Sequence, residues 1–226
     1  MSEIKQPAHI EQEKNILAEA QQFWTKYNKV ISYSLTGVIL IVAIFLGYRY
    51  FIQEPNEKKA SEALFHAEGY YRLDSVKLAL NGDNINAGFI KIISKYGGTK
   101  AASLASFYAG SCYLKTGDFN NAIKYLKDFS TDALQVQARA YGMLGDAYSE
   151  LKKYDEAVTA YKKAGNLFAK DDVISPEYLF RAGYLYESIG KKQEAIEMYQ
   201  QIKDRYPGSQ RGTDIDKYLA RLGAVK

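Results

Sequence analysis

The chain has 226 residues, of which 47% are hydrophobic, and a formal net charge of +4. Its 30 basic and 26 acidic residues are too evenly balanced for a protein that binds nucleic acid by neutralising phosphates. A single cysteine, Cys112, excludes an intramolecular disulfide and a thiolate metal cluster.

Residues 1–29 form an N-terminal tail in which apolar side chains recur at helical spacing between charged ones. This apolar stripe consists of Ile16, Leu17, Ala20, Phe23, Trp24 and Tyr27. We expect an amphipathic helix that lies beside a membrane, with its Trp and Tyr at headgroup level. The alternative is that this helix is a docking surface for a partner at the same membrane face.

The next 19 residues, 30–48, carry no charge, and 11 of them are Val, Ile, Leu or Phe. As a helix this run is roughly 28 Å long, which matches a hydrocarbon core of about 30 Å. It begins too far from the N-terminus and is too long for a cleaved signal peptide. A buried core helix is the alternative, but such helices rarely run this long without a polar face. We therefore predict an uncleaved transmembrane signal anchor over residues 30–52.

The charges that flank the anchor are nearly balanced, so they do not orient it strongly. The short tail and the long C-terminal block favour a cytoplasmic N-terminus and a translocated C-terminal domain. Thr36, Leu40, Ala43 and Gly47 share one stripe of the anchor helix. Ala43 and Gly47 are small residues four positions apart, which permits close contact with another transmembrane helix. The alternative is that small residues are scattered by chance in lipid.

After the anchor, Glu54-Pro55-Asn56-Glu57 is expected to be a short linker. One long amphipathic helix should follow and end at Asn81-Gly82, because Asn-Gly terminates helices. A shorter helix should then stop at Gly97-Gly98, with Thr99 as the N-cap of the next one. Residues 57–97 are thus predicted to form a degenerate helical hairpin.

An internal repeat follows, in which a Gly precedes a Tyr by three positions and an Ala comes nine residues after that Tyr. The three sets are Gly110, Tyr113 and Ala122; Gly145, Tyr148 and Ala157; Gly183, Tyr186 and Ala195. The glycines are 35 and 38 residues apart, close to the tetratricopeptide period of about 34 residues. The small residues allow two antiparallel helices to approach closely, and Leu126, Tyr161 or Tyr199 is expected to fill the space between that hairpin and the next.

These patterns predict repeats over about 103–136, 138–171 and 176–209. A last helix over about 212–223, with Ile215 and Leu219 on one face, is expected to cover the exposed side of the final unit. The expected fold class is all-α: a single N-terminal transmembrane helix, then a tetratricopeptide-repeat α-solenoid over residues 53–226 with a C-terminal capping helix.

No converging set of titratable groups points to an enzyme. His9 and His66, the two histidines, lie on opposite sides of the predicted anchor and cannot share a metal or a proton relay. Gly97-Gly98-Thr99-Lys100 lacks the residue order of a phosphate-binding loop, and Cys112 is expected to be a small core residue of a repeat helix. We therefore expect a non-catalytic protein with no metal, no cofactor, no nucleic-acid partner and no small-molecule substrate.

In a tetratricopeptide array the first helices of successive units line a groove. The positions expected there are Leu104, Phe107, Ser111 and Leu114, then Arg139, Gly142, Asp146 and Ser149, then Glu177, Phe180, Tyr184 and Glu187. These side chains are mainly apolar and acidic, so we predict no Lys/Asn clamp for a C-terminal carboxylate. Phe107 and Tyr184 are expected to contact a partner. An equally weighted alternative is that these aromatic side chains pack between helices.

The short tail, an anchor that ends in Gly47-Tyr48-Arg49-Tyr50 and the C-terminal repeats, including the unit over 99–129, together resemble the bacterial YfgM-like family. The resemblance covers nearly the whole chain in its arrangement. It implies an ancillary subunit of the Sec translocon in the bacterial inner membrane, with the repeats in the periplasm. It also implies a membrane-anchored PpiD-like chaperone as partner and a role in receiving emerging polypeptides. The competing hypotheses are a scaffold of another envelope assembly and an organelle-surface import receptor with cytosolic repeats.

Overall fold

The computed structural model describes residues 8–224, and within that range the chain forms helices and no strand. It divides into two compact units, Met1–Pro55 and Asn56–Lys226. The first seven residues of the predicted tail lie outside the described residues.

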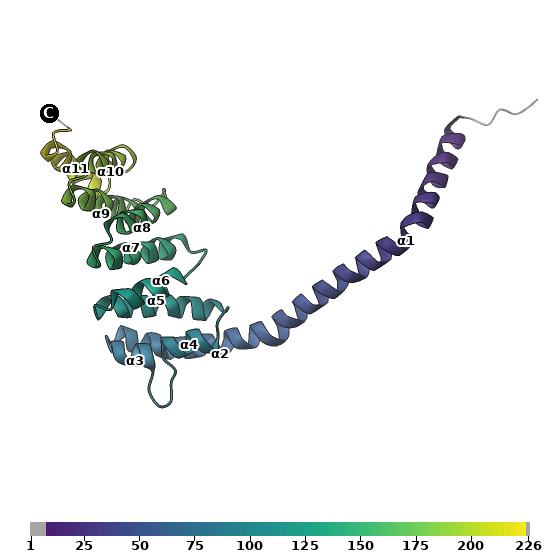
Figure 1. The fold of residues 1–226 in the computed structure, drawn as a ribbon, viewed down its shortest axis with the longest axis horizontal. Helices are drawn as coiled ribbons and strands as arrows, with labels where there is room; N and C mark the ends of the chain where they lie inside the picture. The colour runs from purple at the N-terminus through teal and green to yellow at the C-terminus, as the bar shows by residue number, and fades with distance from the viewer. Residues whose placement is uncertain (1–7, 225–226) are drawn as a thin grey trace, which may run out of the picture. The chain divides into compact units, whose positions relative to one another are not determined.

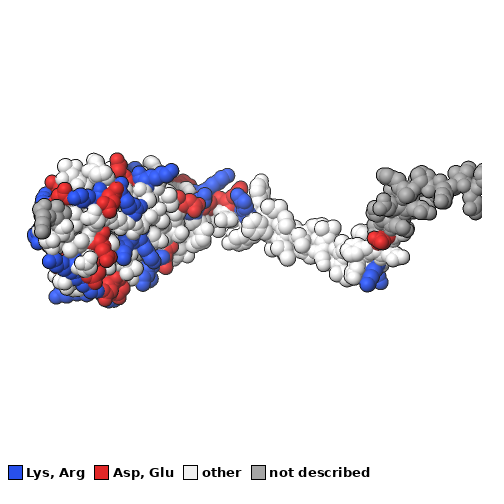
Figure 2. All heavy atoms as spheres, turned by 90° about the horizontal axis from the view of Figure 1, so that it is seen from above, with Lys and Arg blue, Asp and Glu red and all other residues white. Residues whose placement is uncertain are grey.

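The N-terminal unit consists of α1 (Ala8–Tyr48) and the short π-helix η1 (Arg49–Gln53). The predicted juxtamembrane helix and the predicted anchor are therefore parts of a single helix. This helix is long and apolar enough to cross a membrane, and none of its most apolar stretch is buried. The same stretch is free of charged atoms in Figure 2. The alternative of a buried core helix is thus contradicted by its exposure.

The expected linker at residues 54–57 is wrong, because α2 (Glu54–Arg72) begins there without an intervening loop. Pro55 explains why the helix passes through a π-turn just before this point. Proline has no N–H to donate, and its ring clashes with the carbonyl four residues back, here that of Phe51. The Glu54 N–H bonds instead to the carbonyl of Arg49, five residues back, which is the hydrogen bond of a π-helix.

The first hairpin of the second unit differs from the predicted one. Its first helix, α2, ends at Arg72, and a turn around Asp74, at a φ of 55°, leads into α3 (Val76–Asn81). Gly82 ends α3 as predicted, and a loop over residues 82–88 precedes α4 (Phe89–Lys95). The expected continuous helix up to Asn81 is therefore wrong.

This first hairpin is itself a repeat. Ala67, Tyr70 and Ala79 have the same spacing as Gly110, Tyr113 and Ala122, and both alanines are fully buried. Tyr70 and Tyr113 also mark the same turn, since each carbonyl accepts a 2.9 Å hydrogen bond from the backbone N–H five residues later. The sequence predicts this unit only as a degenerate hairpin, because Ala replaces the Gly and the loop over 82–88 interrupts its second helix.

Three regular helix pairs follow, stacked one on the next in Figure 1. They are α5 (Lys100–Lys115) with α6 (Phe119–Lys127), α7 (Leu134–Glu150) with α8 (Tyr154–Leu167), and α9 (Ile174–Ser188) with α10 (Lys192–Arg205). Each predicted repeat overlaps one pair, whose first helix begins two to four residues before the predicted start, and the α-solenoid is confirmed. The Thr99 hydroxyl accepts a hydrogen bond from the Ala102 N–H, so the predicted N-cap of α5 is also confirmed.

The repeat glycines lie where the two helices of a pair touch. A Cβ added to Gly110 would lie 2.5 Å from Leu126, one on Gly145 2.4 Å from Tyr161, and one on Gly183 2.6 Å from Tyr199. These distances are shorter than van der Waals contact, so glycine is required for the close approach. Leu126, Tyr161 and Tyr199 therefore pack against the glycine of their own helix pair, whereas the expectation placed them between that pair and the next.

The last helix, α11 (Gln210–Arg221), covers the final repeat. Its Ile215 and Leu219 are fully buried and belong to one hydrophobic cluster with Tyr199 and Ile202 of α10. The predicted capping helix is thus confirmed, with bounds shifted by two residues from the expected 212–223.

Candidate protein-binding groove

The first helices of the last two repeats, together with α11, enclose a groove. Its volume is about 570 Å³. The side chains that line it come from α7 to α9 and α11: Ser149, Glu150, Lys152, Tyr154, Tyr161, Glu177, Phe180, Arg181, Tyr184, Leu185, Ser188 and Arg211. Four of these, Ser149, Glu177, Phe180 and Tyr184, are among the predicted groove residues.

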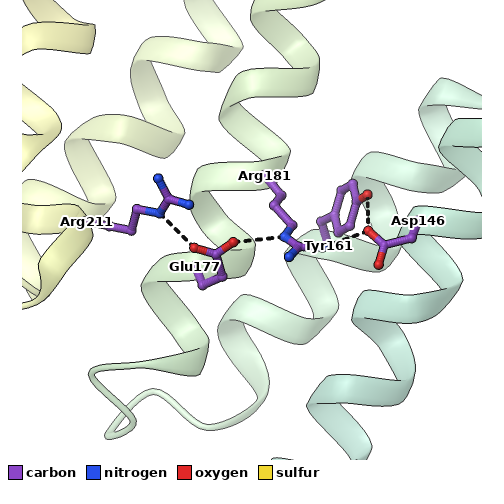
Figure 3. Close-up of polar contacts among 5 residues, drawn as sticks. All are labelled: Asp146, Tyr161, Glu177, Arg181 and Arg211. Atoms are coloured by element: carbon purple, nitrogen blue, oxygen red, sulfur yellow. Dashed lines mark hydrogen bonds and ion pairs between the residues drawn. The ribbon is translucent and has the colours of Figure 1, made fainter. Parts of the chain in front are cut away.

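A chain of polar contacts, here called the polar ladder, crosses the helices around this groove (Figure 3). The Tyr161 hydroxyl donates to Oδ1 of Asp146 at 2.7 Å, and Nη1 of Arg181 contacts the same oxygen at 2.9 Å. Nε of Arg181 donates to Oε1 of Glu177 at 3.0 Å, and Nε of Arg211 donates to Oε2 of Glu177 at 2.7 Å. The ladder therefore links α8, α7, α9 and α11 in sequence.

The ladder is ionised at neutral pH. Burial alone would raise the pKa of the Glu177 carboxyl, but hydrogen bonds from Arg211 and Arg181 lower that pKa below its usual range. Burial and the neighbouring Asp146 carboxylate raise the pKa of Tyr161, so its hydroxyl stays protonated and acts as a donor. Two carboxylates and two guanidinium groups balance, so the ladder itself carries no net charge.

An aromatic pair forms the apolar part of the groove. Phe180 is only 8% exposed, and the guanidinium of Arg211 lies 4.0 Å from its ring centroid. Tyr184 stacks on the same ring at a centroid distance of 6.2 Å, yet it is 55% exposed. Phe180 is thus the buried ring of the pair, and the exposed Tyr184 ring is the one that a partner can contact. An exposed tyrosine ring beside fixed polar groups is typical of a protein-binding contact.

The other predicted groove residues are distributed differently. Phe107 packs against Phe129, with ring centroids 5.2 Å apart, and the Ser111 hydroxyl lies 2.8 Å from that of Tyr71 on α2. Leu114 packs against the hydrophobic cluster of α6 and α7. The alternative that aromatics pack between helices therefore holds for Phe107 and Phe180, and not for Tyr184.

Leu104 lines a separate cavity beside the α6–α7 loop, and Arg139 lines a smaller one beside the start of α9. Glu187 accepts hydrogen bonds from the Tyr199 hydroxyl at 3.0 Å and from Nη2 of Arg221 at 2.8 Å. Gly142 lies under Tyr178, because a Cβ added there would be 2.1 Å from the tyrosine ring. The structure thus brings three of the four predicted residues of the third unit, Glu177, Phe180 and Tyr184, into the groove and leaves all four of the first unit out of it.

The sequence prediction missed Arg181 and Arg211, and it described the groove as apolar and acidic. Nε of each arginine donates to the Glu177 carboxylate, so this atom is not available to bind the carboxylate of a ligand. A signal for Arg181 was present, since it follows Glu177 by four residues and such pairs meet on one helix face. Arg211 comes from the capping helix, and no local spacing connects it to Glu177.

Other candidate positions carry no such arrangement. Cys112 is fully buried, and burial raises the pKa of its thiol to about 11, as expected for a core residue. Among the side chains that the structure describes, no group of three His, Cys, Asp or Glu residues could hold a metal ion. On α1, Thr36, Leu40 and Ala43 are exposed, and a Cβ on Gly47 would meet nothing within 4 Å.

Comparison with known proteins agrees with this architecture. The family model described as a tetratricopeptide repeat-like domain matches residues 21–217. No curated protein matches the chain. Among solved structures, a MamA protein has 19% identity and a TM-score of 0.54 and covers 72% of this chain and 89% of its own. The MamA RS-1 ArsTM double mutant has 16% identity and a TM-score of 0.52, over 87% of this chain and 96% of its own. At these identities the two structures show a common fold.

Proposed function

This chain belongs to the tetratricopeptide repeat-like domain family, and we propose that it is a membrane-anchored scaffold that binds protein partners beside the Sec translocon. A PpiD-like chaperone is the proposed partner, and the proposed task is to help handle secreted or membrane polypeptides. The proposed location is the bacterial inner membrane, with the N-terminus in the cytoplasm and the repeats in the periplasm. The residues of the groove serve recognition, and the scaffold has no catalytic role.

The exposure of the apolar helix is the observation that carries the proposal. Over residues 30–52 a helix spans about 34 Å, enough for a hydrocarbon core of about 30 Å. Exposed aromatic side chains flank this stretch at both ends: Phe23 and Trp24 before it, Tyr50 and Phe51 at its end. Aromatic residues favour the two interfaces of a bilayer. A helix of this length and composition is stable in water only when it is covered, and lipid supplies that cover.

The groove supports the second half of the proposal. Its polar ladder fixes the helices that carry Phe180 and Tyr184, so a partner meets a preorganised surface and loses less entropy on binding. Tyr184 on the first-helix face is the exposed aromatic anchor there. The other predicted groove residues do not line the groove, and we propose that they shape the first-helix face and contact the partner less than Tyr184 does. They are Leu104, Phe107, Ser111, Leu114, Arg139, Asp146 and Glu187.

Purification in mild detergent followed by mass spectrometry tests the proposed partners. We expect the channel subunits of the Sec translocon and a PpiD-like protein to be recovered reproducibly. Recovery of a different envelope assembly instead would contradict the Sec proposal. Protease treatment of intact cells and spheroplasts tests the location, because a periplasmic repeat domain is cleaved only after the outer membrane is opened. Cleavage only after lysis of the spheroplasts would place the repeats in the cytosol.

The substitution Tyr184→Ala tests the groove. Because truncating a central aromatic contact typically costs more than about 1 kcal/mol, we expect at least a fivefold loss of co-purified partner. Phe65→Ala is the matched control, since Phe65 is an exposed aromatic on α2, 65% exposed, outside the groove. Equal recovery with both variants, with the circular dichroism spectra unchanged, would contradict the groove assignment.

The stripe Thr36, Leu40, Ala43 and Gly47 is a proposed contact with a partner transmembrane helix. The double substitution Ala43→Leu and Gly47→Leu fills the small-residue surface and should reduce recovery of membrane partners. If recovery of every membrane partner is unaltered, the helix is only a tether.

A further inference from the structure

The second helix of the 100–127 repeat is short, and this leaves a hollow in the array. The helix α6 has 9 residues, whereas α8 and α10 have 14 each. Five missing residues correspond to about 7.5 Å of helix. The α6–α7 loop, residues 128–133, occupies this position instead, and its Phe129 is the side chain that turns inward, at 5% exposure.

A cavity of about 810 Å³, here called the loop pocket, lies under this loop. We call its large apolar lining residues, Ile93, Leu104, Phe129 and Val136, the floor. The volume lies within the range of pockets that hold small ligands or bulky side chains. The loop pocket shares no lining residue with the groove around Tyr184, so it is a separate surface.

The rim of the loop pocket is held in place by hydrogen bonds from both neighbouring helices. On one side the Ser103 hydroxyl of α5 donates to the carbonyl of Ser130 at 2.9 Å. On the other side the Thr131 N–H donates at 3.0 Å to Oε1 of Gln137, a side chain of α7 that is buried. The pocket is therefore preformed rather than closed by a loose segment, which lowers the entropic cost of occupying it.

Two carboxylates stand on this rim. Asp128 and Asp132 line the loop pocket and are exposed, and neither belongs to an ion pair in the described part of the chain. Lys100 is the one cation among the lining residues, which leaves the rim with a net charge of −1. An apolar floor beneath an acidic rim is complementary to an apolar side chain flanked by positive charge.

We propose that the loop pocket is a second docking site, which receives a bulky apolar side chain of a basic partner segment. The apolar side chain displaces water from the floor made by Leu104, Phe129 and Val136. Lysine or arginine residues beside it pair with Asp128 and Asp132. This proposal goes beyond the groove function, and it is independent of Tyr184.

Three fluorescein-labelled peptides test the proposal by fluorescence anisotropy, with the full chain in phosphatidylcholine nanodiscs. The first carries a central Leu-Phe pair flanked by lysines, the second has glutamates in place of the lysines, and the third keeps the lysines but has Ser-Ser at the centre. Two exposed ion pairs, at about 0.2–1 kcal/mol each, predict that the first binds about two- to thirtyfold more tightly than the second. Binding to the third should be at least tenfold weaker than to the first, because the floor contributes nothing.

Two variants separate the pocket from general charge attraction. The double substitution Asp128→Asn and Asp132→Asn should abolish the preference for lysine over glutamate, while Glu197→Gln and Asp204→Asn on α10 change the net charge equally and should preserve it. Ala133→Trp, at an exposed position of the rim, should block binding in a chain whose melting is unchanged. Equal binding of the lysine and glutamate peptides, equal binding of the Ser-Ser peptide, or full binding by the folded Ala133→Trp variant would each overturn the proposal.

Discussion

Two junctions between neighbouring repeats differ sharply in this molecule. At the α8–α9 junction a Cβ on Gly165 would lie 2.7 Å from Leu179, and the polar ladder crosses from Asp146 to Arg181. At the α6–α7 junction Phe129 lines two cavities, of about 810 Å³ and 490 Å³, compared with the groove of about 570 Å³ and a cavity of about 330 Å³ at the α8–α9 junction. The difference follows from the length of the second helix, 14 residues in α8 against 9 in α6. Helix length within a repeat thus affects how much space remains beside the next repeat.

The largest expected effect comes from matched leucine truncations at the two junctions. Leu179 is fully buried, and Leu179→Ala should lower the free energy of unfolding by about 2–5 kcal/mol. Leu104 is half-buried beside an existing cavity, so Leu104→Ala should cost only about 1 kcal/mol. Urea denaturation of the full chain in mild detergent, followed by circular dichroism, measures both. Equal losses would show that the two junctions are equally closed.

A second comparison makes the same substitution, glycine to alanine, at two positions where the expected changes in stability have opposite signs. At Gly142 the added methyl group meets the Tyr178 ring, so Gly142→Ala should destabilise the domain by about 1–3 kcal/mol. At Gly69, in the last turn of α2, a Cβ meets nothing within 4 Å, and Gly69→Ala should stabilise the domain by about 0.5–1 kcal/mol. Thermal melting reports both signs. A neutral Gly142→Ala variant would mean that α7 and α9 can separate without cost.

The pH dependence of Glu177 gives a smaller and more specific effect. Its pKa is lowered in the folded state, so its contribution to stability is fully present above the unfolded pKa and is lost as the pH falls through the folded pKa. Glu177→Gln should cost about 1–2 kcal/mol at neutral pH, because two arginines lose a charged acceptor. The variant should also lose less stability than the parent chain as the pH falls from above the usual glutamate pKa through the lowered pKa of Glu177. Parallel acid-denaturation curves for the two proteins would contradict the ladder's role.

The sequence was sufficient for those features that depend on local spacing. The repeat glycines, the buried alanines and the capping helix follow from intervals of three, nine and four residues, and each interval reports a contact within one helix pair. The turn after Arg72 was missed because Asp74 adopts a positive φ without a glycine to mark it. The sequence did not predict that the helix continues past Pro55. A π-turn accommodates the proline there, and no residue pattern marks a π-turn.

The groove was only partly predictable for a related reason. Tyr184 and Glu177 lie on the first helix of their repeat, so the repeat alignment places them. Arg211 contacts Glu177 although the two residues are 34 positions apart in sequence. Phe129 lies in the loop after α6 and lines two cavities. Such contacts depend on where one element ends against another, and helix ends are the least predictable property of a sequence.

Hydrogen exchange of the full chain, resolved by mass spectrometry, tests the contrast between the two junctions most directly. Peptides that cover residues 120–137 should exchange through local openings of lower free energy than peptides that cover residues 161–181. The first set borders the larger cavities beside the short helix α6, whereas the second set is held by close glycine contacts and the polar ladder. Slower exchange over 120–137 than over 161–181 would contradict a firm C-terminal half beside an accessible loop pocket.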